Sequence, residues 1–180
     1  MKIREQLIYP AVAGAAYAAL TMLLAPISYG GIQCRLSEAL CVLPFFLPST
    51  AWGLFLGCAV ANCISAAGIL DIVFGSLATL LAGLCTAALG RGWRESGCWP
   101  SLGRRIAACL MPVLWNGLVI GAVLSATLMP RDAFWPGFAM FAGQVAAGET
   151  IAMLLLGLPL MNVLRRRLLP RLGVNDWRRR

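Results

Sequence analysis

The chain has 180 residues, of which 60% are hydrophobic and only 12% are charged, and its mean hydropathy is +0.80. Soluble domains average about 45–50% apolar and about 25% charged residues, and disordered chains have low hydrophobicity, so both classes are excluded. The length suits one domain. We therefore expect a single integral membrane domain that spans residues 1–180.

The first apolar segment, residues 7–25, is long enough to cross a bilayer, which requires about 20 mostly apolar residues. Small residues recur along it at four-residue intervals, at Ala11, Ala15 and Ala19. Such a stripe lets another helix approach closely. It predicts either packing inside a helical bundle or a docking face for a second protein.

The second apolar segment, residues 36–47, is short. Twelve residues of α-helix reach about 18 Å, which is less than the hydrocarbon core of about 30 Å. Arg35 and Glu38 stand three residues apart at its start, and this spacing makes them neighbours on one helical face. They are expected either to form a structural ion pair or to line a cavity.

Two further spans, residues 51–69 and 72–89, are predicted on either side of a tight turn at Gly68. Asn62 lies near the end of the first span, and Asp71 opens the second. An asparagine can hold two membrane helices together by hydrogen bonds, and an aspartate can cap a helix N-terminus. Both are also candidates for a ligand site.

The last two spans, residues 106–128 and 134–164, carry Trp115, Asn116 and Gln144. Like Asn62, Asn116 is expected either to hold two helices together by hydrogen bonds or to contribute to a ligand site. Glu149 lies near the middle of the final span, and no cation lies near it in sequence. A carboxylate at membrane depth is costly and usually faces a bundle interior or a cavity. We therefore expect Glu149 to face a ligand.

Thirteen of the fifteen cations fall in three groups, at residues 2–4, 91–105 and 165–180. The positive-inside rule predicts that all three groups are cytoplasmic, so an even number of crossings must precede residue 90. The short segment supplies the fourth crossing. The sequence thus predicts an all-α membrane bundle of six transmembrane helices with a short second helix, both termini in the cytoplasm and an Arg-rich tail at 165–180. Lipid headgroups, rather than nucleic acid, are the expected contacts of the cations.

In this topology the polar side chains at membrane depth converge below the outer surface. We predict a binding site for a small polar solute, formed by Arg35, Glu38, Asn62, Asp71, Trp115, Asn116, Gln144 and Glu149.

The sequence contains no histidine, no C-x-x-C and no P-loop or G-x-S-x-G motif. Most of the seven cysteines sit inside apolar runs, where a thiol behaves as a small hydrophobe. We therefore expect no metal, no cofactor and no enzymatic activity, and any ATP hydrolysis must come from other subunits.

Five motifs resemble those of a known family, the QueT-type S components of energy-coupling factor (ECF) transporters. The longest is APISYGGIQCRLSEALCVLPFF at residues 25–46. The others are GLFLGCAVAN at 53–62, ILDIVFGSLATLLA at 69–82, WNG at 115–117 and GETI at 148–151.

The resemblance implies a substrate-specific subunit that works with a transmembrane coupling protein and two ABC ATPases in a prokaryotic plasma membrane. Similar subunits dock through an alanine-rich first helix, which here corresponds to Ala11, Ala15 and Ala19, and are thought to topple in the bilayer while carrying the solute inward. The family is assigned to queuosine precursors, the 7-deazaguanines.

The residues suit such a ligand. Glu149 or Glu38 would accept the ring N–H and the exocyclic amine, and Asn116 or Arg35 would donate to the ring carbonyl. Trp115, Phe45 or Tyr29 would stack on the ring, and Asp71 would pair with an aminomethyl cation. The alternatives are an S component for another vitamin or heterocycle and a membrane scaffold or assembly protein, in which Arg35, Glu38 and Glu149 would pair with one another and leave no cavity.

Overall fold

The computed structural model describes residues 4–25, 35–64 and 68–168, and every regular element within these ranges is a helix. In the labels, α marks α-helices and η marks 3₁₀- or π-helical turns. The elements are η1 (Arg4–Ile8), α1 (Tyr9–Leu23), η2 (Leu36–Val42), α3 (Leu43–Phe46), α4 (Thr50–Asn62), η3 (Asp71–Gly75), α5 (Ser76–Ser96), α6 (Leu102–Leu128), η4 (Arg131–Ala133), α7 (Phe134–Ala152), η5 (Met153–Gly157), α8 (Leu158–Val163) and η6 (Leu164–Leu168). Adjoining elements join into six helical segments, which confirms the predicted all-α six-helix architecture.

Four of these segments are long and apolar enough to cross a membrane: Gln6–Leu23, Asp71–Ser96, Leu102–Leu128 and Arg131–Arg167. The segment Leu36–Phe46 is shorter, as the sequence predicted for the second helix. The last segment is longer than one crossing requires, and π-helical turns interrupt its α-helical pattern at Met153–Gly157 and Leu164–Leu168.

The predicted span 51–69 was wrong as one continuous helix, because α4 ends at Asn62. Gly68 has a left-handed φ of 65°, a conformation that breaks a right-handed helix and that glycine adopts without strain. The Gly68 carbonyl then accepts hydrogen bonds from the backbone N–H groups of Asp71 and Ile72, at 3.1 and 3.2 Å. These bonds start the next helix and set Asp71 at its first turn.

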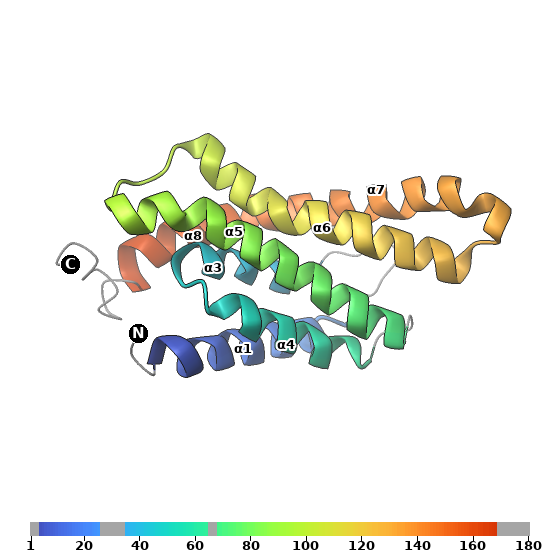
Figure 1. Ribbon diagram of the computed structural model, residues 1–180, viewed down its shortest axis with the longest axis horizontal. Helices are drawn as coiled ribbons and strands as arrows, with labels where there is room; N and C mark the ends of the chain where they lie inside the picture. The colour runs from blue at the N-terminus through green and yellow to red at the C-terminus, as the bar shows by residue number, and fades with distance from the viewer. Residues whose placement is uncertain (1–3, 26–34, 65–67, 169–180) are drawn as a thin grey trace.

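Helices α1 and α4 lie side by side along one face of the bundle, and α6 and α7 form a long hairpin on the other side of α5 (Figure 1). The α1–α4 contact depends on glycine. A Cβ atom at Gly53 would overlap the Pro10 carbonyl, and one at Gly57 would overlap the Gly14 carbonyl. The two backbones therefore touch, as small residues permit in membrane helices.

One end of the bundle holds the described start of α1, the end of α5, the start of α6 and the end of η6 (Figure 1). Arginines gather at this end around Trp99. Arg105 and Arg165 lie 5.4 and 4.3 Å from its ring centroid, and Trp99 stacks on Phe46. The opposite end carries the junction between α4 and η3. This arrangement matches the predicted gathering of cations at one side, while the cytoplasmic placement of that side stays a prediction.

Candidate functional site

The buried polar residues of the chain gather between the helices. Among the described residues, the charged side chains that are buried are Arg35, Glu38, Asp71 and Glu149, which are each 0–3% exposed. They come from the start of η2, from η2 itself, from the first turn of η3 and from α7. Asn62 and Asn116, 0% and 1% exposed, join them from α4 and α6. Segments far apart in sequence thus bring six of the predicted site residues together.

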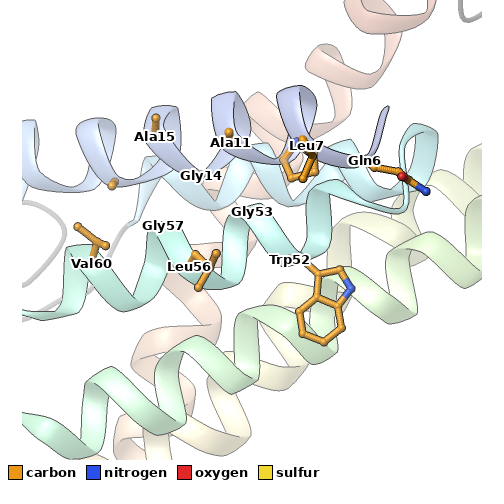
Figure 2. Close-up of a pocket in the computed structure, with 12 residues that line it drawn as sticks. Gln6, Leu7, Ala11, Gly14, Ala15, Trp52, Gly53, Leu56, Gly57 and Val60 are labelled. Atoms are coloured by element: carbon orange, nitrogen blue, oxygen red, sulfur yellow. The ribbon is translucent and has the colours of Figure 1, made fainter. Parts of the chain in front are cut away.

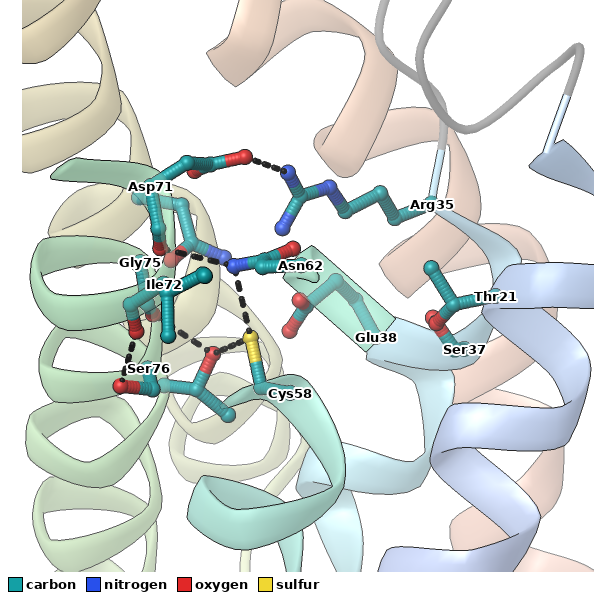
Figure 3. Close-up of polar contacts among 12 residues, drawn as sticks. Thr21, Arg35, Ser37, Glu38, Cys58, Asn62, Asp71, Ile72, Gly75 and Ser76 are labelled. Atoms are coloured by element: carbon teal, nitrogen blue, oxygen red, sulfur yellow. Dashed lines mark hydrogen bonds and ion pairs between the residues drawn. The ribbon is translucent and has the colours of Figure 1, made fainter. Parts of the chain in front are cut away.

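Arg35 and Asp71 form an ion pair across the site, with 3.4 Å between Nη2 and Oδ2. Figure 3 shows the two side chains facing each other, with Asn62 and Glu38 beside them. The Asn62 amide donates to the Asp71 carbonyl at 2.9 Å and to the Cys58 sulfur at 3.5 Å. Asn62 therefore links the end of α4 to the first turn of η3. These hydrogen bonds give Asn62 a structural role that is independent of any ligand.

Glu38 accepts hydrogen bonds from neutral donors. The Tyr17 hydroxyl donates to Oε1, and the Cys41 thiol donates to Oε2 at 3.0 Å. Tyr17 is fully buried and belongs to α1. The first helix therefore contributes a side chain to the site as well as the alanine stripe on its outer face.

One carboxylate oxygen of Glu149 accepts a hydrogen bond, and the other has no partner among the described residues. The Asn116 amide donates to Oε1 at 2.8 Å, whereas Oε2 has no hydrogen-bond partner among the described residues. The amide oxygens of Asn116 and Asn62 and the indole nitrogen of Trp115 are likewise buried without a partner in the described part of the chain. Unbonded buried polar atoms are rare in folded proteins. Glu149, Asn116 and Asn62 thus carry acceptor oxygens that no group of the described residues satisfies.

Gly75 makes room for these side chains. A Cβ atom there would lie 2.6 Å from the Asn62 amide nitrogen and 2.9 Å from Asp71 Oδ1. We expect Gly75→Ala to weaken ligand binding by at least about tenfold, because both side chains must move from positions fixed by hydrogen bonds and an ion pair. The measurement is calorimetric titration of the purified protein.

The control for this prediction is Gly117→Ala, next to Asn116 on α6. The nearest atoms to its added Cβ lie at 3.6 Å, an ordinary van der Waals distance. Equal loss of affinity in the two variants would show that Gly75 has no special role at the site.

Some sequence-based candidates lie elsewhere. Gln144 is exposed on α7, so the structure does not bring it into the cluster. Phe45 is buried against Phe46 and Trp93 in the hydrophobic core, with centroids 5.3 and 6.4 Å away. Trp115 is half-buried beside Asn116. Tyr29 lies outside the described residues.

Sequence reasoning missed three side chains of the site: Tyr17, Cys41 and Cys58. The two cysteines were read as small hydrophobes, yet Cys41 donates to Glu38, and the Thr79 hydroxyl donates to Cys58 at 3.3 Å. The available signal for Tyr17 was a phenol in the middle of an apolar span, since a buried tyrosine hydroxyl usually finds a partner.

A groove runs along the outer face of the α1–α4 pair (Figure 2). Its walls include Ala11 and Ala15 from α1 and Trp52, Leu56 and Val60 from α4. Ala19 is also exposed on α1. The predicted alanine stripe therefore faces outward, while the opposite face of α1 packs into the bundle.

Comparisons with known proteins give one result. A family model described as QueT transporter matches residues 7–166, which contain all five motifs noted in the sequence. No curated protein and no solved structure matches the chain.

Proposed function

Because the chain belongs to the QueT transporter family, we propose that it is the substrate-binding S component of an ECF-type importer and that it carries a 7-deazaguanine queuosine precursor into the cell. Membership of the family and the apolar helices make it a membrane transport protein. The substrate, the ECF partners and the plasma-membrane location are the parts that we propose.

The observation that supports this substrate is the surplus of open acceptors around Glu149. A 7-deazaguanine ring presents several N–H donors, on the six-membered ring, the exocyclic amine and the five-membered ring, and one carbonyl acceptor. Glu149 Oε2 and the oxygens of Asn116 and Asn62 are suited to the donors. Asn116, which the sequence offered as the carbonyl's donor, already donates to Glu149.

The test is a comparison of 7-deazaguanine with 7-deazahypoxanthine, which lacks the exocyclic amine, by titration calorimetry on the purified chain. Losing a hydrogen bond to a charged acceptor costs about 1.5–3 kcal/mol. We therefore expect the amine-free ring to bind at least about tenfold more weakly. Equal affinities, or binding of neither ring, would contradict the assignment of a guanine-like substrate.

The groove on α1 and α4 is the proposed contact with the transmembrane coupling protein. Its alanines allow a partner helix to approach closely, and it lies on the outside of the bundle, away from the buried cluster. Substrate binding and docking would thus use opposite faces of α1, with Tyr17 on the inner face and Ala11, Ala15 and Ala19 on the outer face.

Ala15→Leu tests the docking role. The larger side chain fills the groove, so we expect co-purification with the coupling protein, and substrate uptake by cells, to fall at least about tenfold. Ligand affinity of the isolated chain should not change. Ala147→Leu, at an exposed position of α7, is the matched control. Normal uptake by the Ala15→Leu protein would remove the groove from the interface.

A membrane scaffold without a solute is the second candidate, and the α1–α4 groove alone would suit it. That reading requires Arg35, Glu38 and Glu149 to pair with one another. Among the described residues the buried ion pair joins Arg35 to Asp71, and the hydrogen bonds to Glu38 and Glu149 come from neutral groups. The charge of the site therefore favours a transporter.

A further inference from the structure

The cations at the end of the bundle that holds Trp99 differ in what they bond. Arg91 pairs with the exposed Glu95 at 3.0 Å, and Arg94 donates to two backbone carbonyls at 2.7 Å each. Three others have no acidic partner among the side chains that the structure describes: Arg104, Arg105 and Arg165. In that part of the chain, this end of the bundle therefore carries positive charge that no acid balances.

Two of these arginines are held at one aromatic ring. The guanidinium carbons of Arg105, on α6, and Arg165, on η6, lie 5.4 and 4.3 Å from the centroid of the Trp99 ring. The Asn162 side-chain oxygen accepts from Arg105 Nη1 at 3.2 Å, and this is the one side-chain hydrogen bond that either arginine makes among the described residues. A guanidinium carries several N–H donors. Two like charges are thus neighbours, with most of their donors unused by the described residues.

The start of α6 adds positive potential at the same end. The first turn of an α-helix carries a partial positive charge, which favours acidic side chains there. The first turn of α6 contains no acid and includes Arg104 and Arg105 instead. This placement is electrostatically unfavourable until an anion offsets it. An anion at Arg105 and Arg165 would relieve the repulsion between the arginines and from the helix together.

The type of cation indicates which anion. The positive-inside rule is satisfied equally by lysine and arginine, yet every cation within residues 91–105 and 165–180 is an arginine. A guanidinium binds a phosphate through two parallel N–H donors, whereas an ammonium group acts as a point charge. The arginines therefore favour a phosphate over a mere topology signal.

The position of the arginines indicates the source of the phosphate. The candidate membrane spans Leu102–Leu128 and Arg131–Arg167 have Arg105 near the start of the first and Arg165 near the end of the second. The ends of membrane spans meet lipid headgroups, where tryptophan is also favoured. Leu102, beside these arginines at the start of α6, is an exposed apolar side chain. An amphiphile with a phosphate head and apolar tails fits both the charge and this surface.

We propose that Arg105 and Arg165 bind the phosphate of one anionic phospholipid, with Trp99 holding the two guanidinium groups and the acyl chains lying along α6. Basic pockets between transmembrane helices are typical sites for such headgroups. The arginine-rich groups were expected to contact headgroups in general, and the proposal assigns one lipid to one pair of side chains. It uses no residue of the buried cluster and does not depend on the identity of the substrate.

The experiment offers the full chain in detergent equal amounts of phosphatidylglycerol and phosphatidylcholine, and native mass spectrometry counts the lipids that stay bound. Both lipids contain a phosphate diester, but choline neutralises the charge of the second. Each arginine that faces an anionic lipid raises affinity about fivefold, so we expect bound phosphatidylglycerol to exceed phosphatidylcholine at least about tenfold. Equal retention of the two lipids would overturn the proposal. Displacement of phosphatidylglycerol by an equal concentration of inorganic phosphate would overturn the assignment to a lipid.

Arg165→Gln locates the bound lipid. Arg165 is exposed, so the loss of its charge should leave the packing intact, and we expect retention of phosphatidylglycerol to fall about fivefold. The matched control is Arg91→Gln, which removes the same charge from the same end of the bundle. Arg91 is exposed and paired with Glu95, so retention should stay within about twofold of the wild type. Equal losses in the two variants would show a response to overall charge and would overturn the site. The comparison of the two lipids on the wild-type chain requires neither variant to fold.

Discussion

Replacing Glu149 with glutamine is expected to weaken 7-deazaguanine binding by about 10- to 100-fold, the cost of removing a hydrogen bond to a charged group. Glutamine has the same size and can still accept from the Asn116 amide. It lacks the negative charge, and its NH₂ group would face the N–H donors of the ligand in place of the open Oε2. The fold should be retained, because the substitution adds no volume.

Titration calorimetry of the purified variant gives this affinity, and its melting temperature reports on folding. Glu95→Gln is the matched control, since Glu95 is exposed and pairs with Arg91 at 3.0 Å. Exposed ion pairs contribute little, so this variant should bind as the wild type does. Unchanged affinity in Glu149→Gln would exclude Glu149 from the site.

Gly53→Ala is expected to destabilise the protein strongly for a substitution that adds a single methyl group. The new Cβ atom would overlap the backbone carbonyl of Pro10 and would lie 2.7 Å from its Cα. Backbone atoms cannot rotate away as side chains do, so α1 and α4 must separate. Overpacking costs about 1–3 kcal/mol, and we expect the upper part of that range.

The measurement is the thermal unfolding of the purified variant, and Gly143→Ala is its control. Gly143 is exposed on α7, and no atom lies within 4 Å of an added Cβ. Alanine favours a helix over glycine, so this variant should melt at the wild-type temperature or above it. Equal losses in both variants would show that the close α1–α4 approach contributes nothing to stability.

The helices and their order were predictable because apolar runs of bilayer length have few alternatives to a helix. The end of α4 was not predicted. Residues 51–69 read as one apolar run, whereas α4 ends at Asn62, whose side chain donates to the Asp71 carbonyl. This hydrogen bond forms only once the two helices are placed.

The burial of the four charged residues was predictable, but their pairing was not. Arg35, Glu38, Asp71 and Glu149 stood out because lipid does not tolerate isolated charges, and the structure buries all four. Spacing suggested Glu38 as the neighbour of Arg35, whereas the ion pair joins Arg35 to Asp71, 36 residues away. Long-range partners depend on how helices pack, which a local pattern does not encode.

Gln144 shows the same limit of sequence-based prediction, because it was predicted to line the site and is exposed outside the cluster. Its residue type suited the site, but helical phase decides which face a side chain occupies, and α7 places Gln144 outward and Glu149 inward. Tyr17 faces the site for the same reason, since its face of α1 lies opposite the exposed alanines.

The buried cluster around Glu149 is proposed to hold a small heterocycle, and the transport function depends on this claim. Mass spectrometry of the small molecules that co-purify with the full chain, extracted from cells under mild conditions, tests it most directly. We predict a stoichiometric 7-deazaguanine from the wild-type chain and a strongly reduced amount from Glu149→Gln. A wild-type chain that carries no heterocycle, even after incubation with 7-deazaguanines, would contradict the claim.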